Sequence, residues 1–139
     1  MEPGFELFDH TADIGVRVFA SSLPELVRPA GEGLYAVIGE LVPAGEPRAA
    51  RFDFRDHDPP FLLRDYLAEL LLLFECDRRI MTTLDVEAFW AGRLAVAGES
   101  RAVNKASSLF HHEVKAITYH ELGIRSRPGG YEATYIVDI

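Results

Sequence analysis

The residues best suited to chemistry lie near the start of the sequence, in residues 5–15. This stretch holds Asp9, His10, Thr11 and Asp13 between two apolar runs. Their side chains can bind a cation, a phosphate or a backbone amide. Because successive side chains of a β-strand point to opposite faces, a regular strand cannot direct Asp9, His10 and Asp13 to one point. A tight loop could do so, and the same residues also suit a polar turn capped by its own side chains.

More anionic groups stand at the other end of the sequence. Residues 131–139 form an apolar strand pattern that ends on Asp138 and Ile139, so an ordered strand would offer a carboxylate side chain and an α-carboxylate. Together with Asp13, and with Asp9 in addition, these groups would supply three or four hard oxygen donors. Such a set suits Ca²⁺, Mg²⁺ or Mn²⁺ rather than zinc. The alternative is a structural cap at Asp13 and a solvated tail.

A third polar group lies in residues 115–120. If this run is one strand, Lys115 and Tyr119 share one face while Thr118 and His120 share the other. Lys115 would then reach a phosphate or a carboxylate cluster, or it would be an ordinary surface residue.

Other common sites find little support in the residue spacing. His10, His111, His112 and His120 with Cys76 could supply zinc ligands, but no spacing holds two of them on one element in a zinc-binding arrangement. Neither a glycine-rich phosphate loop nor a G-x-S-x-G nucleophile motif is present.

Length and charge narrow the class of protein. The 139 residues suit a single domain, 1–139. A net charge of −8 argues against broad binding of a phosphate backbone. The single cysteine, Cys76, cannot form an internal disulfide, and neither a signal peptide nor a membrane-length apolar run is visible. We therefore expect a cytoplasmic protein without a membrane partner.

Hydrophobic periodicity predicts two helices among several strands. Ser22 and Glu25 form a capping box for a first helix, which should be kinked or interrupted at Pro29. A second helix, 60–76, should begin behind Asp58 and Pro59 and be buried on several sides. Strands are predicted at 5–8, 14–20, 51–55, 81–90, 93–99, 113–123 (with a continuation to 127) and 131–139, and loops at 41–48 and 100–112. This pattern predicts an α+β fold, with a mixed, largely antiparallel sheet of seven to eight strands packed with two main helices.

Four segments together resemble the archease family, in order and over almost the whole chain. They are residues 5–26 (FELFDHTADIGVRVFASSLPEL), 65–75 (DYLAELLLLFE), 113–122 (EVKAITYHEL) and 135–139 (YIVDI). The resemblance implies an α+β fold. It also implies a non-catalytic accessory protein that activates the GTP-dependent RNA ligase of tRNA splicing and RNA repair. Such a protein promotes guanylylation of the ligase and multiple turnover, and meets RNA only indirectly.

The same resemblance assigns roles to individual residues. It implies a divalent metal site formed by Asp13, Asp138 and the α-carboxylate of Ile139, and a functional lysine at Lys115 near the ligase active site or the nucleotide phosphates. His10 and Asp9 are expected beside the partner. Two alternatives stay open: a general chaperone-like binding module for RNA-processing or RNA-modifying enzymes, and a metal-dependent hydrolase that uses His10 or His120 as acid or base.

Overall fold

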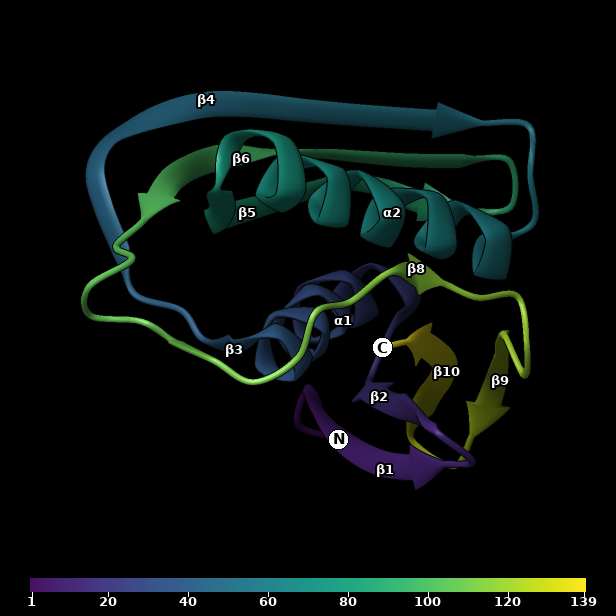
Figure 1. The fold of residues 1–139 in the computed structure, drawn as a ribbon. Coiled ribbons are helices and arrows are strands. Elements are labelled where there is room, and N and C mark those ends of the chain that lie inside the picture. The colour runs from purple at the N-terminus through teal and green to yellow at the C-terminus, as the bar shows by residue number, and fades with distance from the viewer.

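The chain folds as three antiparallel sheets, and two helices lie between the two larger ones (Figure 1). The computed structural model describes residues 1–139. The elements in chain order are β1 (Gly4–His10), β2 (Asp13–Ala20), α1 (Leu23–Ile38), β3 (Gly39–Glu40), β4 (Pro43–Arg55), α2 (Pro59–Asp77), β5 (Arg79–Trp90), β6 (Arg93–Val103), β7 (Leu109–Phe110), β8 (Ala116–Ile117), β9 (Gly123–Arg127) and β10 (Gly130–Asp138). The predicted α+β class with a largely antiparallel sheet is confirmed, although the strands are divided between separate sheets.

The larger sheet has the order β1-β2-β10-β8, and β9 pairs with the other half of β10. Its pairings are antiparallel throughout. Helix α1 covers one face of this sheet, where Val16 and Val18 of β2 are fully buried. The alternate residues of β2, Asp13, Gly15 and Arg17, therefore project from the opposite face. We call this second face the outer face of the larger sheet.

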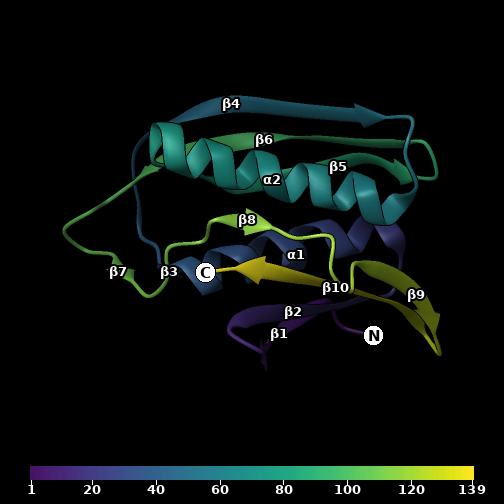
Figure 2. The ribbon, with the colours of Figure 1, turned by 45° about the vertical axis from the view of Figure 1, so that its right-hand side comes forward.

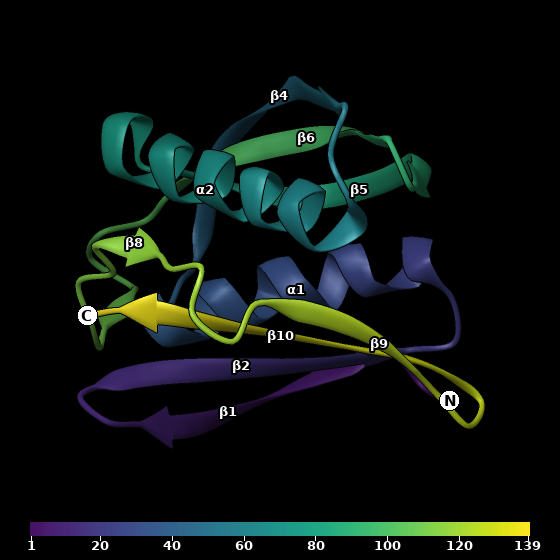
Figure 3. The same cartoon turned by 90° about the vertical axis from the view of Figure 1, so that its right-hand side faces the viewer.

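The second layer is the three-stranded sheet β4-β6-β5, which we call the smaller sheet, and α2 packs against it. The short strands β3 and β7 pair separately, as a sheet of two residues from each strand. Figure 3 shows both helices between the smaller sheet and the larger one. One cluster of 25 buried hydrophobic residues includes residues of these two sheets and both helices. No helix is long and apolar enough to cross a lipid bilayer.

Helix α1 continues through Pro29, so of the two predicted outcomes, a kink or an interruption, the interruption is wrong. Pro29 is buried on the core side of the helix, so tertiary packing offsets the hydrogen bond that proline cannot donate. The buried Tyr135 hydroxyl of β10 donates a 2.6 Å hydrogen bond to the Ala30 carbonyl, which ties the helix to the sheet at this point. The predicted cap is confirmed, since the Ser22 side chain accepts a hydrogen bond from the Glu25 amide.

Two loop predictions are wrong. Residues 41–48 were expected to form a loop because of their prolines, yet β4 begins at Pro43. Strand β4 pairs only with β6 and is an edge strand, where a proline need not donate to a neighbour. The irregularity falls between Ala44 and Arg48, around Gly45 with its φ of 76°. Likewise, residues 100–112 contain the end of β6 and the short strand β7.

The second helix matches its prediction, except at its cap. It begins at Pro59 behind Asp58, but the Asp58 side chain makes no capping hydrogen bond. It ends where Arg78 takes a left-handed conformation with a φ of 52°. Seven of its residues are buried, in agreement with a helix that is apolar over most of its circumference.

Residues 113–123 do not form the predicted single strand. Only Ala116 and Ile117 pair with β10, and a turn separates this β8 from β9. Glu121 in that turn has a φ of 54°, in the left-handed region. Because only Ala116 and Ile117 of residues 115–120 are in a strand, the predicted division of this run into two faces is wrong.

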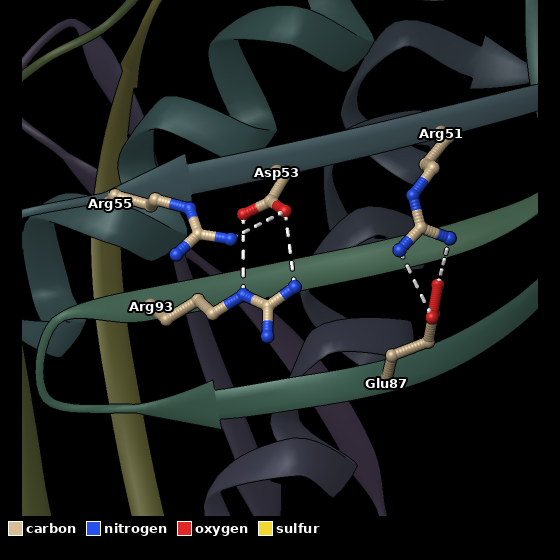
Figure 4. A network of polar contacts seen from close by, with 5 residues as sticks. All are labelled: Arg51, Asp53, Arg55, Glu87 and Arg93. Carbon is tan, nitrogen blue, oxygen red and sulfur yellow. Dashed lines mark hydrogen bonds and ion pairs between the residues drawn. The ribbon is translucent and has the colours of Figure 1, made fainter.

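The solvent face of the smaller sheet carries a network of ion pairs between side chains (Figure 4). Arg51 of β4 forms a bidentate pair with Glu87 of β5, and Arg55 and Arg93 both bond Asp53. The hydrogen bond from Arg93 holds the pKa of Asp53 below its usual range, and the charge of Arg55 acts in the same direction. The alternation of charged and aromatic residues in 51–55 thus places the charges in solvent.

Candidate metal-binding edge of the larger sheet

Asp13 and Asp138 lie side by side on neighbouring strands. Val137 of β10 pairs with Ile14 of β2, and one step further along this antiparallel register Asp138 stands opposite Asp13. Side chains of opposite residues in paired strands project to the same face. Both carboxylates therefore project from the outer face of the larger sheet. Figures 2 and 3 show the end of β10 beside the β1–β2 turn.

His10 extends this row onto β1, whereas Asp9 does not. His10 pairs with Asp13, so its side chain projects from the same face. Asp9 pairs with Ile14 and projects from the opposite face. The expected tight loop is reduced to Thr11 and Ala12, because a two-residue turn with Ala12 at a φ of 68° is enough to reverse the chain. A regular hairpin thus brings His10 and Asp13 together and separates Asp9 from them.

Lys115 and Ile139 lie at the same edge. The backbone N–H of Lys115 donates a 2.8 Å hydrogen bond to the carbonyl oxygen of Asp138. The Lys115 side chain is exposed. Ile139 is partly buried and packs against the hydrophobic core. The sequence-predicted residues thus gather at the edge where β1, β2, β10 and the start of β8 meet, with Asp9 on the other face.

The chemistry of this edge is that of carboxylate oxygens. Asp13 and Asp138 are each only partly exposed, so two anionic groups share a limited contact with water. A divalent cation that prefers oxygen ligands would relieve the repulsion between these two carboxylates. An α-carboxylate at Ile139 would add further oxygen donors. The donor set is therefore compatible with Ca²⁺, Mg²⁺ or Mn²⁺.

The structure brings together two of the histidines considered as zinc ligands, His10 and His120, with Glu121, which the sequence did not indicate as a ligand. His10, His120 and Glu121 place one ligand atom each within 4.8 Å of one another. His10 ends β1, while the other two lie in the turn between β8 and β9. No local spacing signals this group, because its members come from distant segments and the turn at Glu121 was read as strand.

The outer face also contains a buried carboxylate that the sequence did not reveal. Glu132 of β10 is 3% exposed, and three arginines surround it: Arg17 at 3.4 Å, Arg127 at 3.2 Å and Arg125 in closer contact. These arginines balance the charge that burial would otherwise make costly. Glu132 thus anchors β2 and β9 on either side of β10.

Close packing supports the hairpin that carries His10 and Asp13. The Phe8 ring lies directly over Gly15, where a Cβ atom would come within 2.1 Å of the ring. The Arg17 guanidinium also lies over the Phe8 ring, 4.6 Å from the ring centroid. Gly15 is therefore required for close approach of an aromatic ring, a role that its place in an alternating strand did not indicate.

Comparison with known proteins gives a consistent result. The model of the archease protein family matches residues 5–139. The archease of Methanopyrus kandleri is 29% identical over 97% of this chain and 99% of its own length. The archease of Thermococcus gammatolerans is 32% identical over 97% of this chain and 98% of its own length.

Solved structures agree with the fold. The solution structure of protein 1598 from Methanobacterium thermoautotrophicum matches with a TM-score of 0.73 and 27% identity, over 98% of this chain and 99% of that one. A crystal structure from Thermotoga maritima, described as an archease and possible chaperone, matches with a TM-score of 0.73 over 96% of each chain. At 20% identity the second likeness concerns the fold alone. With the family model matching nearly the whole length, this chain belongs to the archease protein family.

Proposed function

We propose that this protein is a non-catalytic accessory factor that activates the GTP-dependent tRNA-splicing and RNA-repair ligase. The observation that carries the proposal is the placement of Asp13 opposite Asp138 on one face, with Lys115 bonded to the backbone of Asp138. Family membership supports it. Asp13, Asp138 and the α-carboxylate of Ile139 would hold a Ca²⁺, Mg²⁺ or Mn²⁺ ion.

The proposed action is delivery or ordering of a metal ion at the ligase. Carboxylates at a sheet edge hold a hard cation while leaving water positions open for exchange. The exposed ammonium group of Lys115 is suited to a nucleotide phosphate or to a carboxylate of the partner. The net charge of −8 favours docking beside a basic cleft and disfavours autonomous binding to RNA. These properties together would promote guanylylation of the ligase and repeated turnover.

A second candidate, a general chaperone-like module for RNA-processing or RNA-modifying enzymes, rests on a groove lined by both apolar and charged side chains. The groove has a volume of about 510 Å³ and lies between the end of α2 and residues 110–114. Phe110 is 50% exposed there, and the neighbouring Leu109 is 59% exposed. Exposed apolar side chains of this kind suit a protein partner. In this case activity would depend on Phe110 rather than on the carboxylates.

The deciding experiment is multiple-turnover ligation by the RNA ligase of the same organism, with limiting Mn²⁺ and GTP. The wild-type protein would be compared with Asp13→Ala, Asp138→Ala and Lys115→Ala, each checked for folding by circular dichroism. Asp9→Ala is the matched control, because Asp9 lies on the same hairpin but on the opposite face. Phe110→Ala tests the groove.

We expect the wild-type protein and the Asp9→Ala variant to stimulate ligation, while the Asp13→Ala and Asp138→Ala variants do not. Stimulation retained by both of these variants but lost in Phe110→Ala would favour the chaperone-like module. Turnover of RNA or nucleotide by the protein alone with a metal ion would instead favour a hydrolase that uses His10 or His120. Absence of stimulation by the wild-type protein would contradict the ligase proposal.

A further inference from the structure

The group formed by His10, His120 and Glu121 lies where two turns meet on the outer face of the larger sheet. The imidazole ring centroids of His10 and His120 are 5.1 Å apart, with a tilt of 57° between the rings. The Nε2 atom of His10 lies 3.6 Å from a carboxylate oxygen of Glu121. Three donor atoms from the two turns thus converge within 4.8 Å.

The backbone holds His120 and Glu121 in this position. The Thr118 hydroxyl donates a 3.0 Å hydrogen bond to the Ile136 carbonyl of β10. The oxygen of this hydroxyl also accepts a 3.2 Å hydrogen bond from the His120 amide. The left-handed φ of 54° at Glu121 then turns its carboxylate toward His10. A residue other than glycine adopts this conformation at a cost in free energy, so the surrounding structure must favour it.

The half-buried His10 ring lacks hydrogen-bond partners for its nitrogen atoms. Its Nδ1 atom is buried and has no hydrogen-bond partner. Its Nε2 atom is 3.6 Å from Glu121, which is too long for a hydrogen bond. A second imidazole stands beside it, and two adjacent imidazolium ions would repel each other. Each neutral ring has one nitrogen lone pair, and the protein offers that of His10 no hydrogen-bond donor. A cation bound there would accept this lone pair and one from His120.

We propose that His10, His120 and Glu121 form a binding site for a divalent transition-metal ion of the Zn²⁺ class. Two imidazoles and one carboxylate form a mixed nitrogen and oxygen donor set, which zinc accepts while keeping a fourth position open. The Irving–Williams order predicts that Co²⁺, Ni²⁺ and Cu²⁺ also bind, whereas Mg²⁺ and Ca²⁺ prefer oxygen donors. This preference separates the site from the carboxylates of Asp13 and Asp138, and the inference does not rest on the proposed function.

Small side-chain movements would complete the coordination. Tetrahedral zinc with bonds of about 2.0–2.1 Å needs donor atoms roughly 3.4 Å apart, so the three donors must close inward from their present separations. His120 is exposed, and the Glu121 side chain is 51% exposed, so both can move toward the more enclosed His10. The bound ion would cross-link the β1–β2 turn to the turn between β8 and β9.

The test is metal binding by the full chain after treatment with a chelator. Isothermal titration with Zn²⁺ would give stoichiometry and affinity, and the visible ligand-field spectrum of added Co²⁺ would report its coordination. The variants are His120→Ala and Glu121→Gln, whose side chains are exposed and thus tolerate change. His111→Ala is the matched control, since His111 is also exposed and lies 3.5 Å from a glutamate, Glu40, but outside any three-residue donor group.

We expect one Zn²⁺ ion per chain and a tetrahedral Co²⁺ spectrum for the wild-type protein and for His111→Ala. His120→Ala and Glu121→Gln should each bind about tenfold more weakly or worse, because each removes a ligand. An Asp13→Asn variant should keep its Zn²⁺ affinity. The proposal is overturned if wild-type protein shows no stoichiometric Zn²⁺ binding or if His120→Ala binds as tightly as the wild type. Loss of Zn²⁺ in Asp13→Asn alone would equally overturn it, by moving the ion to the carboxylate pair.

Discussion

The backbone amide of Lys115 donates a 2.8 Å hydrogen bond to the carbonyl oxygen of Asp138. On the other side of β10, Asp138 stands level with Asp13 in the antiparallel register. Three segments far apart in the sequence thus meet at one sheet edge, and hydrogen bonds between strands fix their relative positions. An ion held there would have carboxylates from two strands and a lysine side chain beside it.

Replacing Asp13 or Asp138 with asparagine should weaken Mn²⁺ binding about tenfold or more, because each change removes a charged oxygen ligand while keeping the side-chain shape. Mn²⁺ binding can be followed by the loss of the free-ion electron paramagnetic resonance signal. Asp9→Asn is the control and should bind as the wild type does, since Asp9 projects from the opposite face. An equal loss in all three variants would show that the acidic surface, rather than a site, attracts the ion.

Adding one glycine after Ile139 should also weaken Mn²⁺ binding. The extra residue shifts the α-carboxylate by about 3.3 Å along the strand direction, beyond the reach of a metal bond of about 2.1–2.6 Å. The Asp13 and Asp138 side chains stay in place, so the variant isolates the α-carboxylate. Unchanged Mn²⁺ affinity would remove Ile139 from the proposed ligand set.

Glu132→Gln should lower the free energy of unfolding by about 2 kcal/mol. The change leaves Arg17, Arg125 and Arg127 without the buried anion that they surround, and breaking a buried ion pair from one side costs free energy. The arginine side chains are themselves 35% to 73% exposed, so water compensates for a part of the loss. Urea unfolding followed by circular dichroism measures the effect.

Glu87→Gln is the matched control for this prediction. Glu87 pairs with Arg51 on the solvent face of the smaller sheet, and surface ion pairs contribute little to stability. Its unfolding midpoint should stay at the wild-type value. Equal destabilisation by the two variants would show that the burial of Glu132 has no particular energetic role.

Gly15→Ala should destabilise the protein by about 1–3 kcal/mol, because the new methyl group would force the Phe8 ring out of its place. Gly123→Ala serves as the control, since a Cβ atom there meets no atom within 4 Å. Thermal unfolding of the two variants can be compared directly. A Gly15→Ala variant as stable as Gly123→Ala would show that Phe8 moves aside without loss.

Stability should fall as the pH rises from about 10 to about 12. Burial raises the pKa of Tyr35 from 10.0 to about 12, against a smaller opposing effect of the hydrogen bond from the Met81 amide, and burial also raises the pKa of Tyr66 and Tyr135. Below pH 10 both folded and unfolded chains keep these protons, so the contribution is complete. Above pH 10 the unfolded chain releases protons that the folded chain retains, which favours unfolding.

The measurement is urea unfolding at a series of pH values, with tyrosinate absorbance near 295 nm. These three tyrosines should ionise together with unfolding rather than before it. A Tyr35→Phe variant should show a shallower loss of stability over the same pH range, because it has one such proton fewer. A pH dependence as steep as that of the wild type would mean that Tyr35 does not contribute.

Periodicity determined the elements whose environment is uniform along their length. In β2 and β10 one face is buried along most of the strand, so alternation in the sequence predicts each strand. Helix α2 is apolar enough to be recognised by composition alone. The capping box at Ser22 could also be predicted, because its hydrogen bond joins residues only three positions apart, and that prediction is confirmed. The four segments that resemble archeases indicated the family because the resemblance rests on the residues themselves and not on a predicted structure.

Tertiary structure decided what depends on distant contacts. Packing kept α1 continuous at Pro29, and the free edge of β4 tolerated the prolines that had indicated a loop. The turn at Glu121 interrupted a predicted strand because its left-handed conformation is fixed beside β10. Only strand register placed Asp13 beside Asp138, and only that turn placed His120 beside His10. Register and turn geometry depend on which strands pair, and local patterns of hydrophobicity do not reveal that pairing, because it is set by contacts between distant residues.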